Sequence, residues 1–128
     1  MLNRPGDVAK FIADRIFEPF DEIDQEELWV LLLTTKNRAT HVAMPYRGLV
    51  SGTQIRTAEV FKDAVRHNAA AIVVAHCHPS GDPTPSSEDV RVTRELVQAG
   101  RLLGIELLDH VIVGDGQFVS MRERGLGF

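Results

Sequence analysis

The chain has 128 residues, of which 44% are hydrophobic and 25% charged, and its formal net charge at pH 7 is −4. This length holds one ordinary domain with its own core, so we expect a single domain over residues 1–128. No apolar run approaches the roughly 20 residues of a membrane span, and the N-terminus lacks a signal-peptide core, which together predict a cytoplasmic protein that does not contact membranes. The basic residues are scattered and residues 21–27 form an acidic block, which argues against direct nucleic-acid binding.

The first half of the chain predicts two helices around a pair of strands. Residues Asp7–Phe17 carry apolar side chains on one helical face. The apolar run Leu28–Thr35 has the length of a strand, and a turn at 36–38 leads into a second strand that ends near Pro45. A second amphipathic helix is expected over Thr57–His67.

The second half predicts a buried strand, a long helix and a hairpin. Ala70–Ala75 is β-branched and apolar without alternation, as in a strand covered on both faces. A proline-rich loop separates it from a helix over Ser86–Leu103. Ile105–Val113 and Phe118–Met121 flank a turn and predict a closing hairpin. The order α-β-β-α-β-α-β-β predicts an α/β fold with a mixed β-sheet flanked by helices.

The segment that carries chemistry runs from the end of the buried strand to the start of the long helix. His76 and His78 stand two residues apart, so in an extended backbone both imidazoles point to one side and Cys77 to the other. Asp89 lies in the first turn of the following helix, which the loop can fold back over the strand end. Two histidines and a carboxylate, with a fourth position left for water, are typical of a catalytic zinc site.

A hydrolase with such a site also needs a base that is not a metal ligand. Glu27 directly precedes the first strand and is the best-placed candidate, although Glu26, Asp24 or Glu88 would serve nearly as well. Ser86 could hold the water or donate to a developing oxyanion. A further histidine, His110, could reach the cleft, but we favour a hydrogen-bonded structural role for it.

Each part of the motif also has an interpretation without a metal. Ser86-x-x-Asp89 matches a helix capping box, and a His-x-His pair at a strand end is more often structural than metal-binding. The combination favours a site, since five residue types at fixed offsets arise by chance only about once in ten thousand chains of this length. Ser86 and Asp89 can serve both roles.

The pattern His-x-His-Pro-x6-Ser-x2-Asp resembles the signature of JAMM (JAB/MPN) metalloproteases. The stretch His76–Asp89, HCHPSGDPTPSSED, is more similar to the RadC branch, in which HNHPSGDPxPSxxD is usual. The resemblance implies the cytidine-deaminase-like JAB/MPN α/β sandwich, one Zn²⁺ per chain bound by His76, His78 and Asp89, Glu27 as the general acid and base, and Ser86 assisting the water. Cys77 replaces the usual Asn, and the segment Ile55–Val60 lacks the Pro and Arg of the family pattern.

The sequence therefore predicts a zinc-dependent hydrolase that cleaves peptide or isopeptide bonds in a protein or peptide substrate. The alternative is a non-catalytic metal-binding or partner-recruiting module associated with DNA repair. A nucleoside deaminase is disfavoured, because the H-x-E and P-C-x-x-C patterns of that chemistry do not occur here. The apolar edge of the closing hairpin could support a homodimer.

Overall fold

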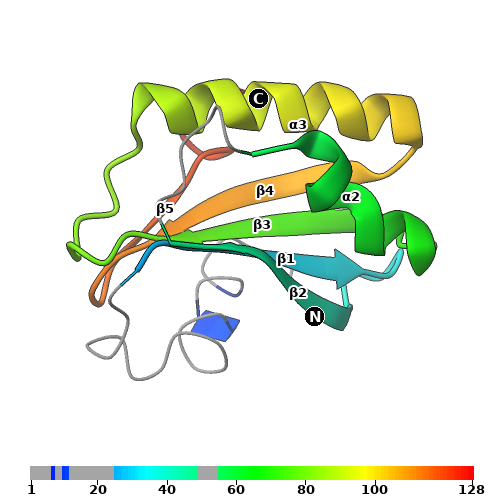
Figure 1. The fold of residues 1–128 in the computed structure, drawn as a ribbon, viewed down its shortest axis with the longest axis horizontal. Coiled ribbons are helices and arrows are strands. Elements are labelled where there is room, and N and C mark those ends of the chain that lie inside the picture. Colours follow the sequence, from blue (N-terminus) through cyan, green and yellow to red (C-terminus); the bar gives the residue numbers. More distant parts are fainter. Residues whose placement is uncertain (1–6, 8–9, 12–24, 49–54) are drawn as a thin grey trace.

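A mixed five-stranded sheet with the strand order β2-β1-β3-β4-β5 forms the centre of the fold in a computed structural model, which describes residues 7, 10–11, 25–48 and 55–128 (Figure 1). The strands are β1 (Glu27–Leu33), β2 (Ala39–Arg47), β3 (Ala71–Cys77), β4 (Glu106–Val113) and β5 (Phe118–Ser120). β3 and β4 are parallel, whereas the other neighbouring strands are antiparallel. The predicted α/β fold with a mixed sheet is confirmed.

The central strand β3 is buried along its whole length, as its unbroken apolar sequence predicts. It lies between β1 and β4, and the helix α3 (Ser87–Leu103) makes the crossover from β3 to its parallel neighbour β4. The C-terminal end of β3 therefore meets the N-terminal end of α3 across one loop, which is where the sequence carries its histidines.

The helix α2 (Thr57–Arg66) and α3 cover one face of the sheet (Figure 1). Each helix buries a stripe of side chains spaced three or four residues apart. Gly104 follows α3 as its C-cap, and its φ of 72° is the left-handed conformation that favours glycine at a helix C-terminus. Near that end, a Cβ on Gly100 would lie 2.4 Å from the carbonyl oxygen of Ile105, so a glycine is needed where the chain turns back toward β4.

Alternate residues of the strands pack into two separate cores. On the helix face of the sheet, the inward residues of β1 join those of α2 and α3, as with Leu28, Val30 and Leu32. On the opposite face, Leu31, Cys77 and their neighbours form a second apolar cluster, against which Phe11 packs. The two clusters together cover both faces of β1, β3 and β4 with apolar side chains.

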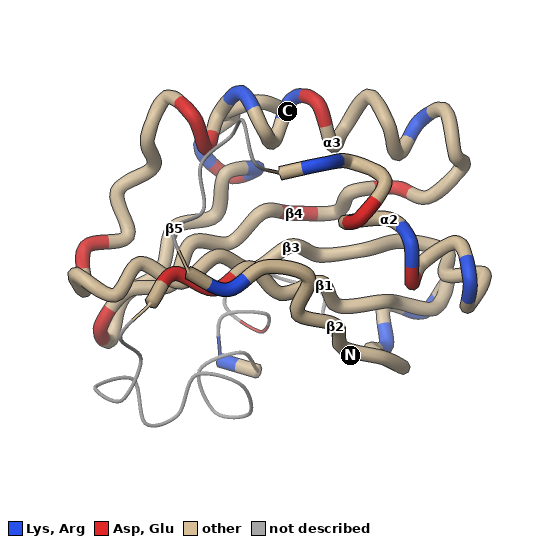
Figure 2. Tube along the Cα trace, viewed as in Figure 1, with Lys and Arg blue, Asp and Glu red and all other residues tan. Residues whose placement is uncertain are grey.

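The helix predicted over Asp7–Phe17 lies largely outside the described residues. Within the described part of the chain, no helix is both long enough and apolar enough to cross a bilayer. Acidic and basic positions are interspersed along α3 (Figure 2), and Arg91 pairs there with Glu88 and Glu95. α3 thus carries no stripe of a single charge.

Candidate metal centre

His76 and His78 lie at the C-terminal end of β3 and both face the side of α3. His76 is opposite Leu28 of β1 in the antiparallel register, and its side chain is 5% exposed. Cys77, between them, belongs to the apolar cluster on the opposite face. The alternation predicted from the His-Cys-His sequence is therefore present, and it separates the polar pair from the buried thiol.

The loop after His78 is held by its own hydrogen bonds. His78 Nδ1 lies 3.0 Å from the carbonyl oxygen of Asp82, and since that oxygen can only accept, Nδ1 carries a proton, which in the neutral ring leaves a lone pair on Nε2. Gly114 permits the loop to approach β4, because a Cβ there would lie 2.2 Å from the carbonyl oxygen of Gly81. The loop thus fixes both the position of the His78 ring and its tautomer.

Ser86 and Asp89 begin α3 with a capping box, so the structural interpretation of this motif is confirmed. Ser86 Oγ accepts a hydrogen bond from the Asp89 amide at 3.1 Å, and Asp89 Oδ2 accepts one from the Ser86 amide at 2.8 Å. The same carboxylate faces the histidines, with Oδ1 3.2 Å from His76 Nδ1 and Oδ2 3.7 Å from His78 Nε2. Capping and proximity to the histidines therefore occur together.

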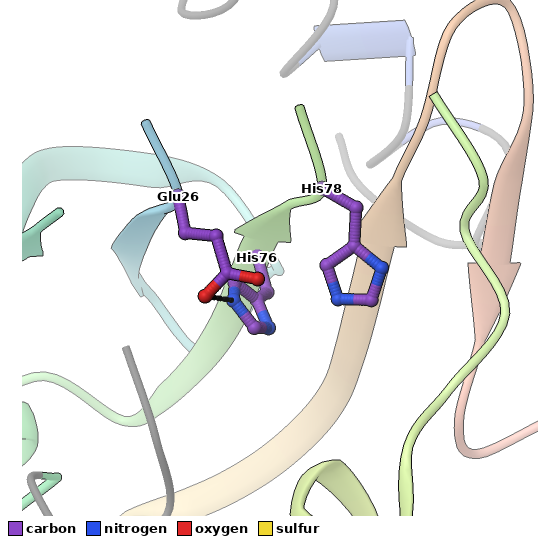
Figure 3. A group of neighbouring side chains, drawn as sticks. All are labelled: Glu26, His76 and His78. Carbon is purple, nitrogen blue, oxygen red and sulfur yellow. Dashed lines mark ion pairs between the residues drawn. The ribbon is translucent and has the colours of Figure 1, made fainter. Parts of the chain in front are cut away.

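Glu26, the residue directly before β1, completes the group. Its Oε2 lies 3.8 Å from His76 Nε2, and its carbonyl oxygen accepts a hydrogen bond from the Gly48 amide. Figure 3 shows the Glu26 carboxylate directed toward His76, with the His78 ring beside them. The ligand atoms of Glu26, His76 and His78 all lie within 4.8 Å of one another, so these residues could hold a metal ion.

Glu27, which the sequence suggested as the base, lies on the other side of the sheet. It pairs with Cys77 in the β1–β3 register, and its carboxylate accepts a hydrogen bond from Trp29 Nε1 at 3.1 Å and meets Arg47 Nε at 3.4 Å. Neighbouring residues of an extended chain point to opposite faces, so Glu26, which the sequence left open as an alternative, faces His76 and Glu27 does not. The sequence alone could not predict the register of β1 against β3, which decides whether Glu26 or Glu27 faces His76.

A small cavity of about 120 Å³ contains this group. Its lining is formed by Glu26, Leu28, Ile55, His76, His78, Ser86, Glu88, Asp89, Val92 and His110. Among the described residues, the buried side-chain nitrogen and oxygen atoms that lack a hydrogen-bond partner are Nδ1 and Nε2 of His76 and Nε2 of His110. Buried polar atoms are nearly always satisfied, so their concentration in one cavity indicates a place for an ion or water.

The charges of the group favour a cation. Burial opposes the charged form of His76, but pairing with Asp89 and then with Glu26 outweighs it and raises the pKa of His76 to about 9. Burial alone would raise the pKa of Asp89, yet pairing with His76 and the hydrogen bond from Ser86 bring that pKa well below its usual value. In the metal-free protein a proton on His76 thus supplies positive charge between two carboxylates, and the donor set of imidazoles and carboxylates fits a divalent ion such as zinc.

A larger hollow of about 500 Å³ lies elsewhere, between the C-terminal half of α3 and the start of β4. Its lining includes Gly100, Glu106 and Phe128 but neither of the histidines described above. Size alone would select this hollow, whereas the clustered ligand atoms select the smaller cavity.

Known proteins are similar in sequence to nearly the whole of this chain. The chain is 51% identical over 127 residues to a UPF0758 protein of Chloroflexus aurantiacus, 55% over 127 residues to one of Roseiflexus castenholzii, and 46% over 126 residues to one of Moorella thermoacetica. These matches cover 98–99% of this chain and 53–54% of the relatives, so the chain spans about half their length.

The chain is thus an α/β protein with a candidate metal centre, in which two histidines at a strand end lie beside two carboxylates. The family model of the RadC-like JAB domain matches residues 2–126. The chain belongs to that family.

Proposed function

We propose that this chain is a zinc-dependent hydrolase of peptide or isopeptide bonds, with His76, His78 and Asp89 as ligands and Glu26 as the general base. The observation that carries the proposal is the cavity in which two histidines and two carboxylates meet around buried nitrogens that lack hydrogen-bond partners. Of the described residues, these form the group whose chemistry is that of a catalytic metal site.

The surroundings of Asp89 suit a metal ligand, and those of Glu26 suit a general base. Asp89 is 8% exposed, is held by the Ser86 amide, and has one oxygen near each histidine, as a fixed ligand requires. Glu26 is 29% exposed and lies farther from His76, at 3.8 Å. A base needs this access to solvent, because it must take a proton from water and later give it to the leaving group.

A bound zinc ion would lower the pKa of a water molecule toward neutrality and polarise the substrate carbonyl. Glu26 accepts one proton of the attacking water as the carbon–oxygen bond forms. It then donates that proton to the amide nitrogen as the carbon–nitrogen bond breaks, so the products are a carboxylic acid and an amine. His78 keeps Nε2 available for this site because Nδ1 donates to the Asp82 carbonyl oxygen.

Ser86 supplies a donor at the rim of the same cavity. Its Oγ accepts the Asp89 amide hydrogen, so the hydroxyl hydrogen is free to turn toward a carbonyl oxygen of the substrate. A donor at that position stabilises the negative charge that develops as water adds to the carbonyl. The same serine thus caps α3 and assists hydrolysis.

The test is a matched pair of variants, Glu26→Gln and Glu27→Gln, assayed with zinc on a panel of quenched peptides and lysine-linked isopeptides. We expect Glu26→Gln to bind zinc but to lose hydrolysis by about 100-fold or more, the usual effect of removing a general base. Glu27→Gln should keep its activity, because that carboxylate contacts Trp29 and Arg47 on the other face.

Equal activity of wild type and Glu26→Gln would overturn the assignment of the base. Zinc binding with no hydrolysis of any panel member by the wild type would instead favour a non-catalytic, partner-recruiting module.

A further inference from the structure

His110 is a second buried histidine at the same cavity, and the proposed mechanism does not use it. It lies on β4, is 1% exposed, and lines the cavity together with His76 and Asp89. Its ring centroid is 6.1 Å from that of His76, and the two rings are inclined by 25°. The ring is thus near the metal centre without belonging to its compact group of ligand atoms.

A bulge in β4 directs His110 to this position. In the register with β3, Ile72 is opposite Leu107 and Val73 is opposite Asp109, which leaves Leu108 as an extra residue. Leu107 packs on the helix face, and regular alternation would then have directed Asp109 to that face and His110 away from it. Bulges that re-aim a side chain are often found next to functional sites.

The hydrogen bonds of His110 define its tautomer. Thr93 Oγ1 lies 2.6 Å from the carbonyl oxygen of Asp89, which can only accept, so the single hydroxyl hydrogen is used there. The 2.7 Å contact between Thr93 Oγ1 and His110 Nδ1 must therefore be donated by Nδ1. A second proton on Nε2 would create a buried charge with no acceptor, so the ring is neutral and Nε2 carries a lone pair.

This lone pair has no partner among the described residues, although the side chain lines a polar cavity. Because α3 occupies Nδ1 through Thr93, Nε2 is the polar atom left to interact with the contents of the cavity. About 120 Å³ is room for several water molecules, and a buried water needs two to four polar partners, which the His76 nitrogens, Asp89 and Ser86 also offer.

We propose that His110 is a positioning residue of this site, whose Nε2 accepts a hydrogen bond from a water molecule held in the cavity beside His76. By taking one hydrogen of that water, His110 fixes how its oxygen is presented to the rest of the cavity. The use of this water in hydrolysis rests on the proposed function, whereas its binding to His110 does not.

Two variants separate this role from a structural one. His110→Asn keeps a polar group near the Nδ1 position, where Thr93 is bonded, and loses the Nε2 acceptor. His110→Gln places an amide oxygen near the Nε2 position and gives up the bond to Thr93. If His110 only supported the fold, Asn would be the better substitute, whereas the proposed role makes Gln the better one.

The first measurement needs neither metal nor activity. Long-range ¹H–¹⁵N spectra of metal-free wild-type protein labelled at histidine should show His110 protonated on Nδ1 alone, and high-resolution crystals should show a water at Nε2. That water should persist in His110→Gln and be lost in His110→Asn. A proton on Nε2, or a dry Nε2 in the wild type, would overturn the proposal even if both variants failed to fold.

The second measurement uses zinc and the substrate found in the peptide panel. We expect His110→Asn to lower kcat by about 10–100-fold with little change in KM, and His110→Gln to recover part of the loss. Zinc affinity, titrated with the metal alone, should change less than kcat does. An Asn variant with wild-type kcat would overturn the positioning role. If the wild type hydrolyses nothing, the proposed function fails, while the spectra and the bound water still decide the assignment of His110.

Discussion

The two faces of the sheet at the end of β3 have the same backbone and opposite chemistry. On the face away from α2 and α3, Cys77 lies in an apolar cluster. Burial raises the pKa of its thiol to about 12, with further contributions from Glu27 and Glu26. On the helix face, one residue away, His76 lies between carboxylates that raise its pKa to about 9. A single step along the strand therefore separates an apolar environment from a charged one.

The variant with the largest expected effect tests whether the sheet face away from α2 and α3 has only a structural role. Leu31→Ala removes a fully buried side chain from that cluster and should lower the free energy of unfolding by about 2–5 kcal/mol, measured by urea denaturation. The folded variant should still bind zinc as the wild type does. A loss of zinc binding by folded Leu31→Ala would show that the two faces are coupled.

Asp89 gives a sharper test, because it caps α3 and faces the histidines. Asp89→Asn can still accept the Ser86 amide but has no charge, so it should weaken zinc binding by about 100-fold or more, near 2.7 kcal/mol, and should lose the stability that comes from pairing with His76. Asp89→Ala should lose zinc binding and in addition about 1 kcal/mol of stability, because the cap is gone. Calorimetric zinc titration and denaturation of both variants separate the two roles. Equal stability of the two variants would argue that the capping contact is unimportant.

The buried histidines predict how the stability of the metal-free protein depends on pH. Burial, followed by the charge of His76, lowers the pKa of His110 to about 3, below its ordinary value of 6.5. Between pH 6.5 and 3, His110 therefore binds a proton in the unfolded chain but not in the folded chain. The free energy of unfolding should fall by up to about 1.4 kcal/mol per pH unit as the pH drops through this range. His76 has the opposite sign, since its folded pKa is raised: its contribution is complete below pH 6.5 and is lost as the pH rises toward 9.

Metal-free protein should thus be most stable near pH 6.5. Denaturation between pH 5 and 9 measures both limbs, and His110→Asn should flatten the acidic one. Unchanged acid sensitivity of that variant would show that another group causes it.

The smallest expected effect is the absence of a reaction. With its thiol pKa raised to about 12 and its side chain buried, Cys77 should not react with iodoacetamide in the folded protein at pH 8. It should react at the normal rate in urea, which serves as the control. Rapid alkylation of the folded protein would mean that this face opens to solvent.

Much of the fold could be predicted because its signals are local. The apolar run before the histidines became β3, and Ser86 caps α3, which ends at Gly104 as glycine placement favours. The spacing of His76 and His78 predicted that both side chains point to the same face of the sheet, without any knowledge of the neighbouring strands. These features depend only on the period of a strand or the chemistry of a helix end.

The remaining features depend on pairing between distant strands. The choice between Glu26 and Glu27 needed the register of β1 against β3, in which Glu27 is opposite Cys77. The orientation of His110 needed the bulge at Leu108, which no turn residue marks in the sequence. A shift of one residue in the strand register moves each of these side chains to the other face of the sheet. Composition and periodicity within one segment therefore could not predict which face each occupies.

The most direct test of the proposed metal centre is the metal content of untagged protein, measured by mass spectrometry after zinc is added and excess is removed. We predict about one zinc per chain in the wild type and in the exposed control His67→Ala, and none in His78→Ala or Asp89→Ala. Wild type without zinc, or zinc retained in both His78→Ala and Asp89→Ala, would contradict the assignment of a metal centre to the end of β3.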